Sequence, residues 1–206
     1  LTPAELIDFF KNEPVDFLPG ENFKYDNSGY ILLGYIIETI TGQSYADFVE
    51  EHIFKKLEMS ASQYASHKEV IQNRASGYQK KEAYINSREI SFTLPYASGS
   101  LMSTVGDMFT WQEAIKNNLL ISKETTVKAF TNYTLNNGER INYGYGWHIK
   151  EKNGIQTREH GGSIFGFKSM GVYLPDADIY VIGLNNCDCN SPTEITREIA
   201  ELVGKN

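Results

Sequence analysis

Apolar residues recur at helical spacing through the first two thirds of the chain. The segment Thr2-Pro3-Ala4-Glu5 opens this pattern, with a threonine before a proline and a glutamate three residues after the threonine. Such a segment is typical of a helix start, because the two side chains satisfy free backbone N–H groups of the first turn. Similar start signals predict further helices over residues 28–41, ending at Gly42, over residues 44–57, from residue 104 onward, and over residues 122–130.

The pattern changes to strands in the last third. Segments 146–149 and 156–159 flank Asn153-Gly154, a dipeptide that favours a two-residue hairpin turn. Segments 168–174 and 179–184 flank a second turn at residues 175–178, and residues 192–203 have the spacing of a closing amphipathic helix. Residues 60–100 are turn-rich, with short strands near residues 74–79. The sequence thus predicts helices followed by an antiparallel sheet.

Composition narrows the function classes. The 206 residues are 41% hydrophobic and 13% aromatic, which is enough to build a core. The net charge of −7, without a run of lysines or arginines, argues against nucleic acid as a partner. No apolar stretch has the roughly 18 residues of a membrane span. Residues 1–10 lack the basic and apolar pattern of a signal peptide, so we expect a mature or truncated start.

The two cysteines, Cys187 and Cys189, are separated by one residue. A bridge across so short a loop would be strained, so the sequence favours two reduced thiols at the end of a strand. No histidine pattern accompanies them, and a metal site is not expected there.

Four short motifs carry the candidate chemistry. They are Tyr25-Asp26-Asn27 directly before the long apolar helix, residues 99–103 before another helix, residues 143–147, and His160-Gly161-Gly162-Ser163 between two predicted strand regions. In this order they resemble motifs of the serine β-lactamase/penicillin-binding-protein superfamily, in its class C-like branch. The resemblance covers nearly all of the chain but only the later part of a family domain.

One family motif is absent from this sequence. The superfamily is recognised by Ser-x-x-Lys, a Ser/Tyr-x-Asn motif and a Lys-Thr-Gly motif. No serine here is followed three residues later by lysine, and the nearest imitation is Thr125-Thr126-Val127-Lys128. The resemblance therefore implies that the nucleophile belongs to an N-terminal segment that was cleaved, omitted or lost.

The resemblance assigns catalytic roles to Tyr25, Asn27 and His160. Tyr25 would shuttle a proton, which a phenol does near neutral pH only beside positive charge. Asn27 offers an amide and a carbonyl, suited to holding the family's lysine and a substrate amide. His160 replaces the family's usual lysine and is only partly charged near pH 7, so it should bind a substrate carboxylate more weakly.

Residues 161–163 would line the oxyanion and substrate site. Gly161 replaces the family's usual hydroxyl residue and Gly162 follows it, while the Ser163 backbone N–H matches an oxyanion donor. The departures at His160 and Gly161 favour an esterase, peptidase or amidase over a strong β-lactamase.

Each of these residues also has a purely structural interpretation. Outside the motif context, Tyr25 would be a packing aromatic, Asn27 a helix cap and His160 part of a turn at a strand end. Other positions are expected to be structural: Tyr145 and Trp147 as sheet core or site wall, Gly99 and Ser100 as turn residues, and His52, His67 and His148 at the surface or in the core.

The resemblance implies a single incomplete β-lactamase-like domain over residues 1–206, of the α/β (α+β) class. Residues 1–130 would form a mainly helical lobe, and residues 131–206 an antiparallel sheet with the C-terminal helix. Because elements of the complete fold would be absent, apolar surface should be exposed and self-association could follow.

The predicted function is that of part of a serine hydrolase, inactive alone, which acts through an acyl-enzyme on an ester, a D-amino-acid peptide or a β-lactam-like amide. The alternative is a non-catalytic binding or regulatory module descended from that family. The expected partner is a small-molecule or peptide substrate. No cofactor or metal is expected, and the family resemblance suggests the cell envelope, the periplasm or secretion.

Overall fold

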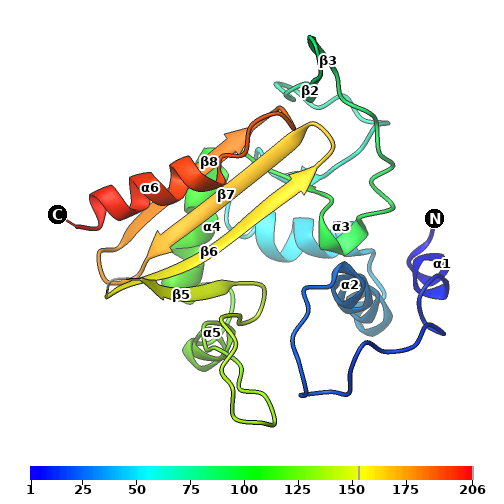
Figure 1. Cartoon of the computed structure of the whole chain (residues 1–206). Coiled ribbons are helices and arrows are strands. Elements are labelled where there is room, and N and C mark those ends of the chain that lie inside the picture. Colours follow the sequence, from blue (N-terminus) through cyan, green and yellow to red (C-terminus); the bar gives the residue numbers. More distant parts are fainter. Residues whose placement is uncertain (153, 206) are drawn as a thin grey trace. The chain divides into compact units, whose positions relative to one another are not determined.

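A four-stranded antiparallel sheet dominates the last third of the chain (Figure 1). The structure is a computed structural model that describes residues 1–152 and 154–205. The strands follow one another in space in chain order: β5 (His148–Lys152), β6 (Ile155–Ile164), β7 (Phe167–Leu174) and β8 (Ile179–Asn185). The predicted sheet is therefore confirmed, with longer strands than the sequence pattern delimited.

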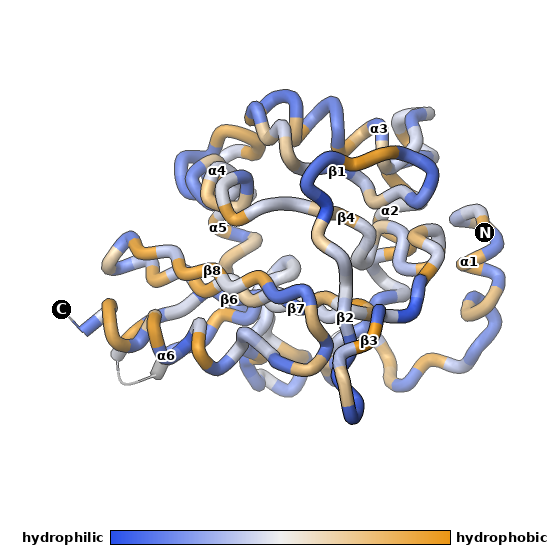
Figure 2. Tube along the Cα trace, turned by 90° about the horizontal axis from the view of Figure 1, so that it is seen from above, coloured by the Kyte–Doolittle hydropathy of each residue, from blue (hydrophilic) through white to orange (hydrophobic). Residues whose placement is uncertain are grey.

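Helix α6 (Thr193–Val203) packs against β7 and β8 and closes this core. Apolar and polar residues alternate along it (Figure 2). The alternating residues Met170, Val172 and Leu174 of β7 are buried in one cluster with Ala200 of α6. Because successive strand residues point to opposite faces, this alternation places one face of β7 against the helix.

The other helices begin where side chains cap their free N–H groups. Helix α1 (Pro3–Asp8) has the predicted reciprocal pair, with Glu5 N donating to Thr2 Oγ1 over 3.2 Å and Thr2 N donating to Glu5 Oε2 over 2.7 Å. Ser44 and Ser122 likewise cap α3 and α5. The remaining helical bounds are α2 (Asn27–Thr41), α3 (Tyr45–Val49), the π-helix η1 (Glu50–Phe54), the 3-10 helix η2 (Tyr96–Ser98), α4 (Val105–Lys116) and α5 (Lys123–Ala129).

The two predicted hairpins have different outcomes. The turn between β7 and β8 forms as expected, with Asp178 at a positive φ of 52°. The Asp178 carboxylate accepts hydrogen bonds from Lys116 and Tyr173, which holds the turn in place. The other predicted turn depends on Asn153, which lies outside the described residues.

The structure also contains two small antiparallel ladders of two strands each. Strand β1 (Gln63–Tyr64) pairs with β4 (Leu101–Met102), and β2 (Tyr78–Lys80) pairs with β3 (Tyr84–Asn86). The β2–β3 hairpin joins the end of the large sheet, because Tyr78 N donates to Asn186 O over 2.9 Å and Asp188 N donates to Tyr78 O over 3.0 Å.

The chain divides into two compact units. The first comprises residues 1–72 and 90–111, and the second comprises residues 73–89 and 112–206. Helix α4 contributes to both. The hydrophobic centre of the first unit is formed by Val49, Phe54 and Met59 with Trp111 packed against them. The expectation that the whole chain is one incomplete domain, with lobes over residues 1–130 and 131–206, stays a prediction.

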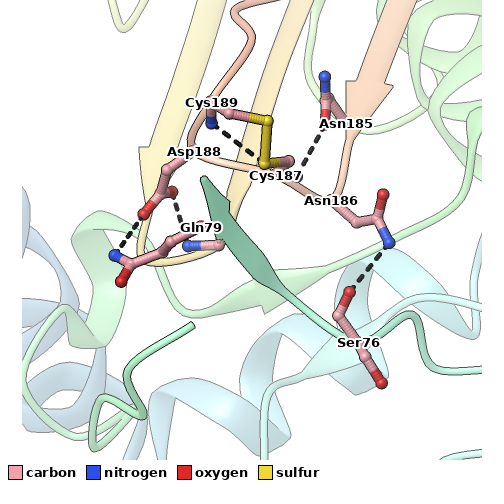
Figure 3. The surroundings of a disulfide bond; sticks show 8 residues. Ser76, Gln79, Asn185, Asn186, Cys187, Asp188 and Cys189 are labelled. Atoms are coloured by element: carbon pink, nitrogen blue, oxygen red, sulfur yellow. Dashed lines mark hydrogen bonds between the residues drawn. A yellow bond between two sulfur atoms is a disulfide. The ribbon is translucent and has the colours of Figure 1, made fainter. Parts of the chain in front are cut away.

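The expectation of reduced thiols is wrong. Cys187 and Cys189 form a disulfide just after β8 (Figure 3). Their Cα atoms are 5.2 Å apart, within the range that a disulfide spans. The backbone curls around the bond, with Cys189 N donating to Cys187 Sγ over 3.2 Å and Cys187 N donating to Asn185 Oδ1 over 2.7 Å. The bond forms because this curl brings the two side chains together.

Candidate active site

The segment His160–Ser163 lies inside strand β6, not between two strands as expected. Its residues pair with β7 in the register His160 to Gly171 and Ser163 to Lys168. Pairing with β7 fixes the backbone of this segment from one side, whereas β5 pairs with β6 only over residues 155–159. The interpretation of His160 as a strand-end turn residue is therefore wrong.

His160 lies in a cluster of three rings within the second unit. The Tyr143 hydroxyl is 3.3 Å from His160 Nε2, and the His148 ring stacks on the His160 ring with centroids 5.9 Å apart. Tyr143 in turn meets His148 edge-on at 4.8 Å and is 7% exposed. Burial lowers the pKa of His160, and a backbone hydrogen bond at Gly161 opposes that effect only in part. His160 is therefore a neutral, oriented hydrogen-bonding group near pH 7.

His148 shares this environment. Burial lowers its pKa, and the charges of Lys150 and His160 act in the same direction. The sequence assigned His148 only to surface or core, and it missed Tyr143 as a contact of His160. Strand alternation gave no signal for this contact, because the β5–β6 register pairs His148 with Glu159 and not with His160.

Glu159 anchors β6 to α6. Glu159 is 2% exposed, and its carboxylate accepts two hydrogen bonds from Arg197, over 2.9 Å to Oε2 and 2.6 Å to Oε1, and one from Lys150. Burial alone would raise the pKa of Glu159, but these hydrogen bonds and charges together lower it. Consecutive strand residues point to opposite faces, so this ion pair fixes the backbone that carries His160.

Neighbouring strand β7 leaves little room at the two glycines. A Cβ on Gly161 would lie 3.0 Å from the Ser169 carbonyl oxygen and 3.1 Å from Met170 Sδ, and a Cβ on Gly162 would lie 2.8 Å from Ser169 Oγ. The close approach of β7 thus leaves little space at Gly161 for the hydroxyl side chain that the family usually has there. Ser163 is exposed, and its role as an oxyanion donor stays a prediction.

Tyr25 and Asn27 lie in the first unit, at the start of α2. Tyr25 is 47% exposed, and Asn27 is exposed as the first helical residue. The helix cap is Asp26, whose Oδ1 accepts from Ser28 N over 2.9 Å, so Asn27 does not serve as the cap. Its amide is therefore not committed to capping.

The predicted site residues fall into two groups in two different units. Tyr25 and Asn27 belong to the first, and residues 160–163 belong to the second. That both groups line one site stays a prediction.

The other motif residues have structural surroundings. Ser100 is 1% exposed and donates to the Phe92 carbonyl over 2.6 Å, as expected of a turn residue. Trp147 packs edge-on against Phe130 at 5.5 Å, whereas Tyr145 is 68% exposed. Among residues 1–152 and 154–205, no helix is long and apolar enough to cross a membrane, and no group of three or more metal-ligating side chains converges.

This fold is of the β-lactamase/transpeptidase-like class. Residues 2–203 match the Beta-lactamase family, so the chain belongs to that family, within the β-lactamase/transpeptidase-like superfamily. Penicillin-binding protein 4* of Bacillus subtilis is 32% identical over 200 residues, which cover 88% of this chain and 44% of that protein. A D-aminopeptidase of Brucella ovis is 23% identical over 188 residues, covering 91% of this chain and 36% of that protein.

A solved structure extends this similarity to the fold. The octameric penicillin-binding protein homologue from Pyrococcus abyssi superposes with a TM-score of 0.83 at 32% identity, covering all of this chain and 48% of that one. The chain thus spans about half the length of these three proteins, or less.

Proposed function

We propose that this chain is the later part of a serine hydrolase that acts through an acyl-enzyme on an ester, a D-amino-acid peptide or a related amide. The observation that carries the proposal is the His160–Ser163 segment, held in β6 with a half-buried His160 beside Tyr143, in a chain of the Beta-lactamase family. The D-aminopeptidase relative supports the choice of a D-amino-acid substrate.

The proposed chemistry divides among the residues as follows. A serine outside the printed chain attacks the substrate carbonyl, and Tyr25 relays its proton to the leaving group. Asn27 holds the substrate amide, and the Ser163 N–H donates to the oxyanion of the tetrahedral intermediate. A hydrolysing water then releases the acyl group from the serine.

The neutral state of the His160 ring near pH 7 favours ester, peptide and amide substrates over penicillin-like substrates. A lysine at this position would attract a substrate carboxylate with a full positive charge. Burial lowers the pKa of His160, so its ring offers a hydrogen bond near pH 7 without that charge.

The competing proposal is a non-catalytic binding module, favoured by the absence of any Ser-x-x-Lys segment from the printed sequence. The two proposals differ in whether a covalent adduct forms. The test is the intact mass of this chain, and of the longer protein that contains it, after treatment with a fluorophosphonate and with a penicillin.

We expect one adduct on the longer protein and none on this chain. The Thr125→Ala and Ser163→Ala variants are matched controls, because they remove the hydroxyl of the Thr-x-x-Lys imitation and that of the predicted oxyanion strand. An adduct on this chain would disprove the external nucleophile. If neither protein reacts, the binding module replaces the hydrolase.

A further inference from the structure

A cavity of about 300 Å³ opens beside the turn that follows the candidate oxyanion strand. Three segments of the second unit line it. They are the β2–β3 hairpin with the residues directly after it, the β6–β7 turn and the loop after β8, which contribute Gln79, Lys80, Lys81, Arg88, Phe165, Asp188 and Cys189.

The floor of this cavity is fixed by Asp188. Its Oδ1 accepts from Gly166 N over 2.6 Å and its Oδ2 accepts from Gln79 Nε2 over 2.8 Å, so one carboxylate joins all three segments (Figure 3). The Cys187–Cys189 bond curls the loop that carries Asp188. Both oxygens of Asp188 are thereby engaged in the wall.

Close backbone packing holds the hairpin against the β6–β7 turn. Gly166 has a positive φ of 79°, and a Cβ there would lie 2.8 Å from Gly77 Cα. Only glycine satisfies both the conformation and the approach. Asn186 Nδ2 adds a hydrogen bond to the Ser76 carbonyl over 2.9 Å, also drawn in Figure 3. Close backbone approach and side-chain hydrogen bonds together hold the cavity walls in place.

The cavity is positively charged in an acidic chain. Lys80, Lys81 and Arg88 line it against the single carboxylate of Asp188, whereas the whole chain carries −7. Within residues 1–152 and 154–205, none of these three cations forms an ion pair, and the Lys80 ammonium lies over the Tyr84 ring at 5.6 Å. Unpaired cations around a concave surface attract an anion.

Phe165 gives the same cavity an apolar wall and links it to the candidate site. Its side chain is 46% exposed. Ser163 lies two residues earlier along the chain, which corresponds to about 7 Å of extended strand. An anionic group in the cavity could therefore belong to a molecule whose reacting carbonyl lies at Ser163.

We propose that this cavity is a subsite for the carboxylate of an acyl amino acid or short peptide, whose apolar part contacts Phe165. The inference rests on the proposed function, since it names the substrate group that this site takes. In this proposal Lys81 and Arg88 bind the substrate carboxylate, and His160 does not. Arg88 supplies a planar fork suited to a carboxylate, and Lys81 supplies a second charge.

The test is binding of hippurate, an aromatic acyl glycine, to this chain. Isothermal titration gives the Kd, and the Gly166 amide resonance reports binding at the cavity. Hippuramide is the neutral matched ligand, and inorganic phosphate tests whether any anion suffices. We expect hippurate to bind roughly tenfold more tightly than either, because only hippurate offers both a carboxylate and an apolar group.

The protein variants separate a site from general charge attraction. The double variant Lys81→Gln/Arg88→Gln should weaken hippurate binding roughly tenfold or more. Lys123→Gln removes an exposed charge on α5, outside the cavity, and should change the Kd less than about twofold. Equal weakening by both variants, equal affinity for hippuramide, or phosphate binding as tight as hippurate would each overturn the proposal. The ligand comparison on the unaltered chain remains decisive if a variant does not fold.

The binding test is independent of catalysis. If hippurate binds but the longer protein forms no adduct, the subsite proposal stands and the hydrolase proposal is disproved. If the longer protein forms an adduct but hippurate does not bind, the hydrolase proposal stands and the subsite proposal is disproved.

Discussion

Glu159 is the residue whose loss should cost the most stability in β6. Its carboxylate is buried, whereas the side chains of Arg197 and Lys150 are 42% and 40% exposed. Glu159→Gln removes the charge but keeps the shape, so the cations lose their partner while remaining partly solvated. We expect a loss of about 2 kcal/mol in the free energy of unfolding, measured by urea denaturation.

Glu151→Gln on β5 is the matched control, because Glu151 is exposed. Its effect should stay below about 0.5 kcal/mol. Since the pKa of Glu159 is lowered, the stabilisation from its charge is present above its ordinary value of 4.5 and is lost as the pH falls through the folded value. A Glu159→Gln variant as stable as the Glu151→Gln variant would contradict the anchoring role.

His148 and His160 should make the chain less stable in mild acid. Both have lowered pKa values in the folded state, mainly through burial. Below the ordinary value of 6.5 the unfolded chain therefore binds more protons than the folded chain. The free energy of unfolding therefore decreases as the pH decreases. The loss has an upper limit of about 1.4 kcal/mol per pH unit for each ring, and partial solvent exposure reduces it.

Urea denaturation between pH 7.5 and 5 checks this expectation. The His148→Gln/His160→Gln variant should show a flatter pH dependence than the unaltered chain. His52→Gln, on the π-helix η1, should keep the original slope. If the free energy of unfolding of the double variant depends on pH as steeply as that of the unaltered chain, the two histidines are not the source of the acid sensitivity.

At the scale of elements, helix starts could be predicted because caps are local. Thr2, Ser44 and Ser122 each bond to an N–H within three residues, so sequence alone contains the interaction. Gly42, with its φ of 71°, ends α2 for an equally local reason.

The ring cluster around His160 could not be predicted in the same way. Tyr143 and His148 reach His160 only through strand register and the fold of the preceding segment. The Cys187–Cys189 bond likewise depends on a curl that Asn185 helps to hold. Non-local register and loop conformation are properties that one local pattern does not contain.

Helix α2 should make the isolated chain associate. Gly34 is its buried residue and packs against η2, whereas Leu33, Ile36 and Ile40 are 53%, 47% and 78% exposed. These three lie at helical spacing on one side of α2 and form an exposed apolar strip. We expect Ile36→Ser/Ile40→Ser to reduce self-association at least threefold, measured by size-exclusion chromatography with light scattering.

Val127→Ser on α5 is the control for this surface, because Val127 is 58% exposed but lies on another helix. It should leave the association unchanged. A compact monomer of the unaltered chain that does not bind a hydrophobic dye would show that α2 is not an adhesive surface.

At the scale of the whole molecule, the roles of Tyr25 and His160 can be tested only where the nucleophile is present. The chain belongs to the Beta-lactamase family, and the two residue groups lie in separate units, so we expect them to act together only in a protein that also carries the nucleophile. If Tyr25 relays the proton of the serine, Tyr25→Phe in that protein should slow acylation by roughly 10² to 10³, because the ring remains while the transferable proton is lost.

The readout that separates this role from a structural one is the acylation rate by stopped flow, together with the Kd of an unreactive substrate analogue. Tyr25→Phe should lower the rate and leave the Kd within about twofold, since a group that acts only on the transferred proton contributes little to ground-state binding. Tyr133→Phe, at an exposed tyrosine in the second unit, should change neither quantity. A Tyr25→Phe protein that acylates at the original rate would return Tyr25 to its structural interpretation, and the proton relay would then have to be sought on the segment that carries the serine.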